Sequence, residues 1–97
     1  MIKEYLIQEG AVGAENAITT QALMCAFHMT DRKVIAVVAD ERKNGALICE
    51  RRSEGGGYYM PATDEEILKQ KARFEKGFVS RAYALRPFRA WAKAHKE

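Results

Sequence analysis

Two pairs of adjacent basic side chains are the groups in this sequence that best suit chemistry with a partner. Arg32 and Lys33 come directly after Thr30-Asp31, a typical helix start, while Arg51 and Arg52 lie in a polar link rich in glycine. Cationic side chains at a helix N-terminus can reach phosphates, and the backbone N–H groups there add to an anion site. Glycines beside an arginine pair allow a partner's backbone to approach closely. The two pairs therefore predict an anionic partner.

The sequence pattern shows no set of groups typical of catalysis or metal binding. No Ser/His/Asp, Cys/His or paired-carboxylate arrangement stands out, and Gly55–Gly57 lacks the lysine and strand-to-helix context of a phosphate-binding loop. His28 and His95 have no second ligand at metal spacing. Cys25 and Cys49 make neither a disulfide scaffold nor a four-ligand zinc site. We expect no enzymatic activity, no metal and no cofactor, and reduced thiols in a cytoplasmic protein.

The charge is distributed unevenly along a chain long enough for one small domain. The 97 residues carry a net charge of +3. Residues 1–60 have seven basic and eight acidic side chains, whereas residues 61–97 have nine and five. The overall basicity therefore supports an anionic partner less than the two basic pairs do. No apolar run approaches the ~20 residues of a membrane span, and the charge pair Lys3-Glu4 argues against a signal peptide, so we expect no membrane partner.

The basic pair Arg32-Lys33 is expected at the start of a helix over residues 31–43. The valine and isoleucine content of this segment would favour a strand, but the capping residues at its two ends favour a helix. Thr30 is a good N-cap, and Asn44-Gly45 is a strong stop signal. The inward stripe is predicted from four residues at helical spacing: Val34, Val37, Val38 and Glu41.

Shorter elements are predicted before this helix. Residues 2–7 suit an opening helix, which Gly10 and Gly13 end, and residues 17–19 could form a short strand. Thr20 is predicted to cap a two-turn helix that ends before a turn at residues 28–30. The apolar face of that helix consists of Ala22, Leu23, Ala26 and Phe27.

A hairpin and a long helix are predicted after the helix over residues 31–43. The apolar runs 46–49 and 58–60 flank the link 50–57, and Pro61 ends the second strand. Tyr58 and Tyr59 alternate in a strand, so one is expected in the core and the other at the surface or against a partner. Thr63–Glu66 is a capping box that starts a long helix, with a kink or break near Arg86 because of Pro87.

Four stretches carry a resemblance to a known family: residues 17–23, 30–34, 45–48 and the distinctive Gly56-Gly57-Tyr58-Tyr59-Met60-Pro61. With them, and with two helices joined by a three-residue turn before a hairpin, the chain resembles the winged helix-turn-helix domains of small phage and prophage-associated proteins of bacteria. The resemblance implies an α+β, mainly α fold. Its three-helix core and β-hairpin wing would span residues 1–62, followed by a helical extension over residues 63–97.

The same resemblance implies binding of double-stranded DNA by a small transcriptional regulator or a phage or mobile-element factor. In that family the third helix lies in the major groove and the wing contacts the backbone or the minor groove. The implied contact residues are Thr30, Asp31, Arg32, Lys33, Ile35, Ala36 and Ala39 on the helix, with Arg51 and Arg52 on the wing.

One departure from the family keeps a second hypothesis open. Relatives often carry basic or polar side chains where this chain has Ile35, Ala36 and Ala39. Apolar side chains can touch only thymine methyl groups, and Asp31 cancels part of the local positive charge. The alternative is a winged-helix module for protein interaction or assembly without significant DNA binding.

The C-terminal helix predicts a homodimer. An apolar stripe down the long helix exceeds what a core of about 60 residues can cover, so a second copy of the chain is expected to meet it. The stripe consists of Ile67, Phe74, Phe78 and Leu85. The alternative is that the chain folds back over its own domain after Pro87.

Overall fold

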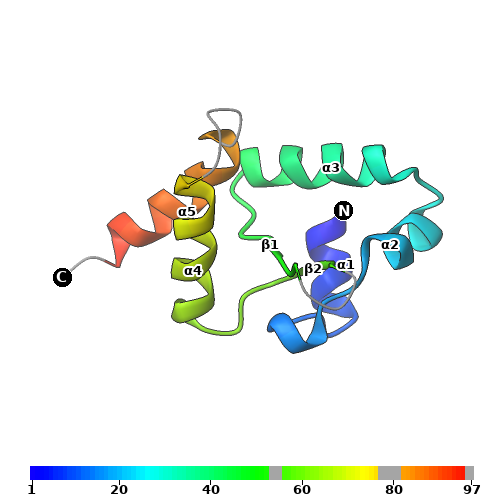
Figure 1. Ribbon diagram of the computed structural model, residues 1–97, viewed down its shortest axis with the longest axis horizontal. Coiled ribbons are helices and arrows are strands. Elements are labelled where there is room, and N and C mark those ends of the chain that lie inside the picture. Colours follow the sequence, from blue (N-terminus) through cyan, green and yellow to red (C-terminus); the bar gives the residue numbers. More distant parts are fainter. Residues whose placement is uncertain (53–55, 77–81, 96–97) are drawn as a thin grey trace.

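The protein is an α+β, mainly helical chain. The computed structural model describes residues 1–52, 56–76 and 82–95, except for the side chains of 82–85. Within these ranges five α-helices and a two-stranded antiparallel sheet follow one another along the chain (Figure 1). The elements are α1 (Ile2–Gln8), the 3-10 turn η1 (Ala14–Asn16), α2 (Thr20–Phe27), α3 (Asp31–Lys43), β1 (Cys49–Glu50), β2 (Tyr58–Tyr59), α4 (Asp64–Glu75) and α5 (Ala82–Ala94).

Side-chain caps set the limits of α2 and α3. Thr30 has extended backbone, and its hydroxyl oxygen accepts from the Lys33 N–H at 3.2 Å, which confirms the predicted cap. The cap of α2 was expected at Thr20, which is wrong by one position. The extended residue is Thr19, whose hydroxyl oxygen accepts from the Ala22 N–H at 3.1 Å. The turn between the helices begins at His28, whose φ of 54° is left-handed.

The two predicted strand segments pair, but the first strand is Cys49–Glu50 and not the predicted run 46–49. The second strand also pairs with the segment predicted as a strand at 17–19. The register pairs Cys49 with Tyr59, and Ile18 makes an antiparallel bridge to Tyr58 on the other edge of β2. This bridge requires Gly57, because a Cβ atom there would lie 2.6 Å from the Ile18 carbonyl oxygen and the φ of Gly57 is +125°. The segment around Ile18 therefore lies beside β2, although the regular strand predicted there reduces to a single bridge.

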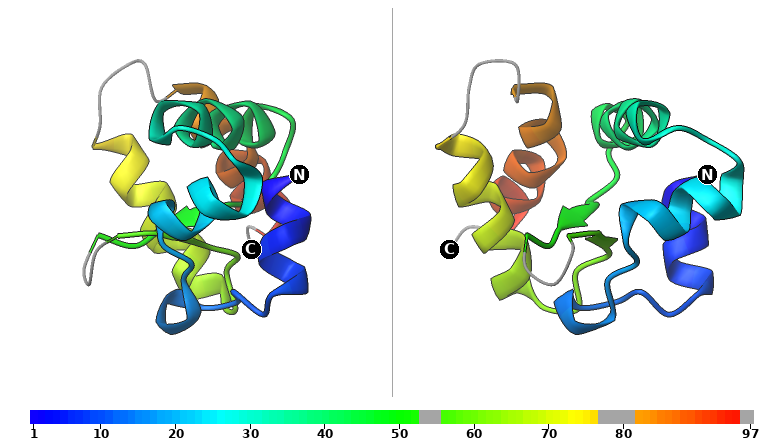
Figure 2. Two further views of the ribbon diagram at one scale, coloured as in Figure 1. Left: turned by 90° about the vertical axis from the view of Figure 1, so that its right-hand side faces the viewer. Right: turned by 45° about the vertical axis from the view of Figure 1, so that its right-hand side comes forward.

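The short sheet separates two hydrophobic clusters. Successive residues of a strand point to opposite faces, so Tyr58 belongs to the cluster under α1, α2 and α3, and Tyr59 to the cluster with α4 and α5. Figure 2 shows α4 and α5 on one side of the strands and α1 and α2 on the other. Both tyrosines are buried, at 8% and 6% exposure. The expectation that one of them lies at the surface is wrong, because helices cover both faces.

The beginning of α4 is fixed to the N-terminal half. The Thr63 hydroxyl oxygen accepts from the Glu66 N–H at 3.2 Å, which confirms one half of the predicted capping box; in the other half, Glu66 binds the N–H of the residue before the cap. The Glu66 carboxylate reaches back to the Ala62 N–H at 2.7 Å and also accepts from the Ala14 N–H at 2.9 Å. One carboxylate therefore orients α4 and joins it to η1.

The long C-terminal helix was predicted incorrectly. α4 ends at Glu75 and α5 begins at Ala82, and the two helices pack together while α5 also packs on α3 (Figures 1 and 2). The helix α5 continues across Pro87, although proline removes a backbone hydrogen bond. Its neighbour Phe88 is fully buried, with its ring 5.3 Å from the ring of Phe74. Burial of Phe88 offsets the local cost of the proline. No helix among the described residues combines the length and hydropathy that crossing a membrane requires.

We predict that Phe88→Ala lowers the free energy of unfolding by about 3–5 kcal/mol, because it leaves a cavity in the second cluster. Urea denaturation followed by circular dichroism measures this, with Phe88→Leu as a milder variant. Ile7→Ala on α1, where the side chain is 52% exposed, is the control and should change stability by less than about 1 kcal/mol. Equal effects at the two positions would show that α5 does not pack as described.

Candidate functional site

The exposed side of α3 brings most of the predicted contact residues together. Thr30, Asp31, Arg32 and Lys33 are exposed at its beginning. The apolar residues among the predicted contacts, Ile35, Ala36 and Ala39, are exposed further along, and Ile35 has an exposed fraction of 56%. Val34 and Val38 of the same helix are buried in the first cluster, as predicted.

Helical spacing groups five exposed residues of α3 into one strip. At 3.6 residues per turn they fall within an arc of about 100°. We call this strip the outer face of α3; it consists of Arg32, Ile35, Ala36, Ala39 and Lys43. Lys43 was not predicted on this face, although its position four residues after Ala39 on a predicted helix is a signal that places it there.

The amide groups at the start of α3 are already in use. The Thr30 hydroxyl oxygen accepts from the Lys33 N–H, and the Asp31 carboxylate accepts from the Arg32 N–H at 2.7 Å. The expectation that backbone N–H groups add an anion site here is therefore weakened, since two of the unpaired amides of the helix are satisfied by side chains. Any anion at this end must be bound by the side chains of Arg32 and Lys33.

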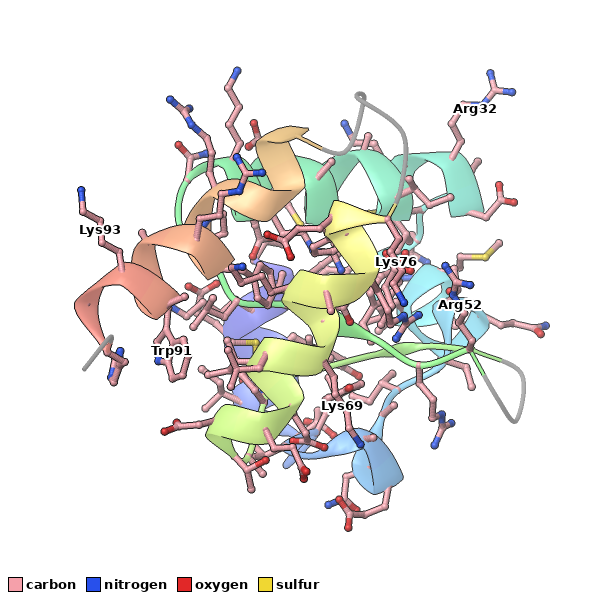
Figure 3. All side chains as sticks on the ribbon, turned by 60° about the vertical axis from the view of Figure 1, so that its left-hand side comes forward. Arg32, Arg52, Lys69, Lys76, Trp91 and Lys93 are labelled. Atoms are coloured by element: carbon pink, nitrogen blue, oxygen red, sulfur yellow. The ribbon has the colours of Figure 1, made fainter. Side chains whose placement is uncertain are left out.

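The two wing arginines have different roles. Arg51 is half-buried, and its guanidinium donates to the carbonyl oxygens of Ala14 at 3.1 Å and Gly56 at 3.4 Å. Arg51 was predicted as a contact residue, but these bonds engage it in holding the hairpin to η1. Arg52 is exposed. In Figure 3 both Arg52 and Arg32 lie toward the right of the view, whereas Trp91 and Lys93 lie at the left.

A buried arginine holds α3 against the hairpin. Arg42 is 5% exposed, its Nε donates to the Ile48 carbonyl oxygen at 2.8 Å, and its Nη1 lies 3.1 Å from the Glu50 carboxylate. The guanidinium carbon also lies 4.8 Å from the centre of the Phe74 ring. Burial lowers the pKa of Arg42 and the Glu50 charge opposes that change, so the side chain remains a cation inside the protein.

Glu50 is bound on three sides by residues distant in the sequence. Besides the Arg42 pair, its N–H donates to Gln70 Oε1 at 2.8 Å, and its carbonyl oxygen accepts from Arg73 Nη1 at 2.8 Å. We call Arg42, Glu50, Gln70 and Arg73 the polar junction. Sequence reasoning missed it, although one signal exists: Gln70 falls on the apolar stripe of α4 between Ile67 and Phe74. A polar residue at such a position indicates an internal hydrogen-bond partner.

The apolar stripe expected at a dimer interface is not exposed where it is described. Ile67 and Phe74 are 6% and 3% exposed, and both belong to the second cluster with Phe88. We correct their assignment as surface residues, because α5 of the same chain covers them. Phe78 lies outside the described residues, as does the side chain of Leu85. The chain instead folds back over its own domain, which is the stated alternative to a dimer interface. The helix breaks between α4 and α5 and not at Pro87.

The remaining reactive groups offer little chemistry. Cys25 is exposed, whereas Cys49 is buried and its burial raises the pKa of the thiol to about 12, so it stays protonated. Across residues 1–52, 56–76 and 82–95, no three His, Cys, Asp or Glu residues are grouped to hold a metal ion. At the end of α5, the rings of Trp91 and His95 stack with centroids 4.3 Å apart.

Comparison with family models, with curated protein sequences and with solved structures finds no match for this chain.

We predict that Arg42→Met lowers the free energy of unfolding by about 1–3 kcal/mol, because it leaves the half-buried Glu50 carboxylate without its partner. Thermal and urea denaturation measure the loss. Glu50→Gln in the same protein removes the uncompensated charge, so the double variant should be more stable than Arg42→Met alone. A double variant whose losses simply add would show that the two side chains are not coupled.

Proposed function

We propose that this protein binds double-stranded DNA as a winged-helix protein, with α3 in the major groove and Arg52 of the wing at the phosphate backbone. The observation that carries the proposal is that Arg32 at the α3 N-terminus and Arg52 of the wing are both exposed, and both lie toward the right of the view in Figure 3. Side chains at the N-terminal end of a recognition helix contact base edges in this mode of binding.

The order and pairing of the elements support this proposal. A helix, the Ile18 bridge, two helices joined by a short turn, and a hairpin follow one another, as in a winged helix-turn-helix. Ile18 pairs with β2 on the edge opposite β1, so the wing and the segment before α2 form one small sheet. That sheet holds the hairpin at a fixed place relative to α3.

The exposed charges set the expected strength of binding. Three exposed cations on α3 and the wing can contact phosphates in this mode: Arg32, Lys33 and Arg52. Three phosphate contacts predict a slope of about −2.7 for log K against log salt concentration. Such binding is modest, which fits a protein that needs additional contacts or a second copy at its target. Regulation of transcription, or of a phage or mobile-element process, follows from the resemblance and is part of the proposal.

A protein-interaction role is the second candidate, and the exposed apolar centre of the α3 outer face favours it. Ile35 is among the few large hydrophobic side chains with more than half of their surface exposed. With Ala36 and Ala39 it forms an apolar patch on a helix, a surface that also suits a protein partner.

The first test is fluorescence anisotropy with a random-sequence duplex at two salt concentrations. We expect affinity to fall by about 40-fold between 50 and 200 mM salt. Arg32→Ala and Arg52→Ala should each weaken binding and reduce the salt slope by about 1. Lys93→Ala on α5, which removes an exposed cation from the other side of the molecule in Figure 3, is the matched control.

Two outcomes contradict DNA binding as proposed. One is the absence of binding at low salt, and the other is binding that the Arg32→Ala, Arg52→Ala double variant leaves unchanged. Arg51→Ala separates structure from contact, since it should lower the melting temperature through loss of the Ala14 and Gly56 bonds, whereas Arg52→Ala should not.

A homodimer through the C-terminal helices remains a prediction, and its interface would have to use exposed residues. Leu68 is the large apolar side chain that the described part of α4 leaves at the surface. We expect a dimer in sedimentation equilibrium at micromolar concentration, and a monomer for Leu68→Glu. Ile7→Glu on α1, where the side chain is 52% exposed, is the control. A monomeric mass for the unaltered chain would contradict the prediction.

A further inference from the structure

The outer face of α3 changes character along its length. Arg32 lies in the first turn and Lys43 at the last residue, so both ends are basic. Between them lie Ile35, Ala36 and Ala39, which have no hydrogen-bonding group in their side chains. The sequence of the strip is thus cation, apolar centre, cation.

The position of this apolar centre suits a helix that lies in a major groove. The major groove of B-DNA is about 12 Å wide and admits an α-helix. With the N-terminal end of α3 in the groove, as in the proposed mode, Ile35, Ala36 and Ala39 would follow Arg32 within about two turns along the base edges. The two alanines also allow the helix to approach those edges closely.

The base edges offer one apolar group to such a surface. Guanine, cytosine and adenine present hydrogen-bond donors or acceptors in the major groove, and thymine adds its C5-methyl group. Donors and acceptors covered by Ile35, Ala36 or Ala39 would lose water without gaining a partner, which is unfavourable. Contact with a methyl group buries apolar surface on both sides and is favourable. The apolar centre therefore selects for thymine.

We infer that the outer face of α3 recognises thymine-rich duplex DNA through thymine C5-methyl groups that pack against Ile35, Ala36 and Ala39. This inference rests on the DNA binding proposed above and adds the sequence class that the site prefers. Hydrogen-bonded base recognition is then confined to the end of the strip where Arg32 can reach a guanine.

Replacement of thymine by uracil tests the inference, because uracil lacks only the methyl group and keeps the base pair and the charge. Anisotropy titrations would use two duplexes of about 20 base pairs, identical in A·T-rich sequence, one with thymine and one with uracil. We expect the uracil duplex to bind about three- to tenfold more weakly, which corresponds to one or two buried methyl groups. A G·C-rich duplex should gain affinity when its cytosines carry a C5-methyl group at the same place in the groove.

Two variants assign the effect to the proposed residues. Ile35→Ala removes apolar contact from an exposed position and should bring the thymine-to-uracil ratio close to one, with an unchanged circular dichroism spectrum. Arg32→Ala should weaken binding to both duplexes by the same factor and leave the ratio intact, because it removes a phosphate or guanine contact.

The outcomes separate this inference from the proposed function. Equal binding of the thymine and uracil duplexes overturns the thymine preference and leaves DNA binding in place. A thymine-to-uracil ratio that Ile35→Ala does not change overturns the assignment to this helix face. Failure to bind either duplex at low salt overturns the proposed function and the inference with it.

Discussion

The ion pair between buried Arg42 and half-buried Glu50 is the interaction on which the arrangement of the other elements depends. Arg42 belongs to α3, Glu50 to β1, and Gln70 and Arg73 of α4 bind the backbone of Glu50. A buried ion pair adds little net stability over apolar packing, but its geometry is demanding and the loss of one partner is costly. We therefore regard the polar junction as the feature that fixes the angle of α3 relative to the wing and the C-terminal helices, and with it the surface proposed to bind DNA.

Two helical layers cover a sheet that is too short to be stable alone. Tyr58 and Tyr59 point in opposite directions and each enters a separate cluster. Consequently, the C-terminal helices α4 and α5 pack against the sheet and against α3, and they do not extend away from the N-terminal half. The other helices pack into the two clusters on either side of the sheet. The apolar centre on the outer face of α3 therefore stays exposed.

Local signals predicted the elements that local chemistry controls. Thr30, the Asn44-Gly45 stop and the Thr63 capping box all lie where expected, because a cap needs only residues within one turn. The errors concern residues whose roles depend on distant partners. Arg51 is engaged by Ala14, and Ile67 and Phe74 are covered by Phe88, contacts that no local pattern encodes. The thymine preference of α3 and its DNA contacts remain predictions.

The sequence by itself determined the three N-terminal helices, the beginning of α4, the approximate place of the hairpin, and that α3 has an apolar centre between basic ends, since each follows from residue type and helical or strand spacing. Only the tertiary structure decided which of the basic residues face solvent. Of the arginines in the N-terminal half, Arg42 and Arg51 are engaged internally, whereas Arg32 and Arg52 are exposed. The physical reason is that a guanidinium is buried only where the fold brings carbonyl or carboxylate oxygens close enough to accept its hydrogen bonds. The spacing of residues along the chain does not show which oxygens come close, so the sequence does not reveal them.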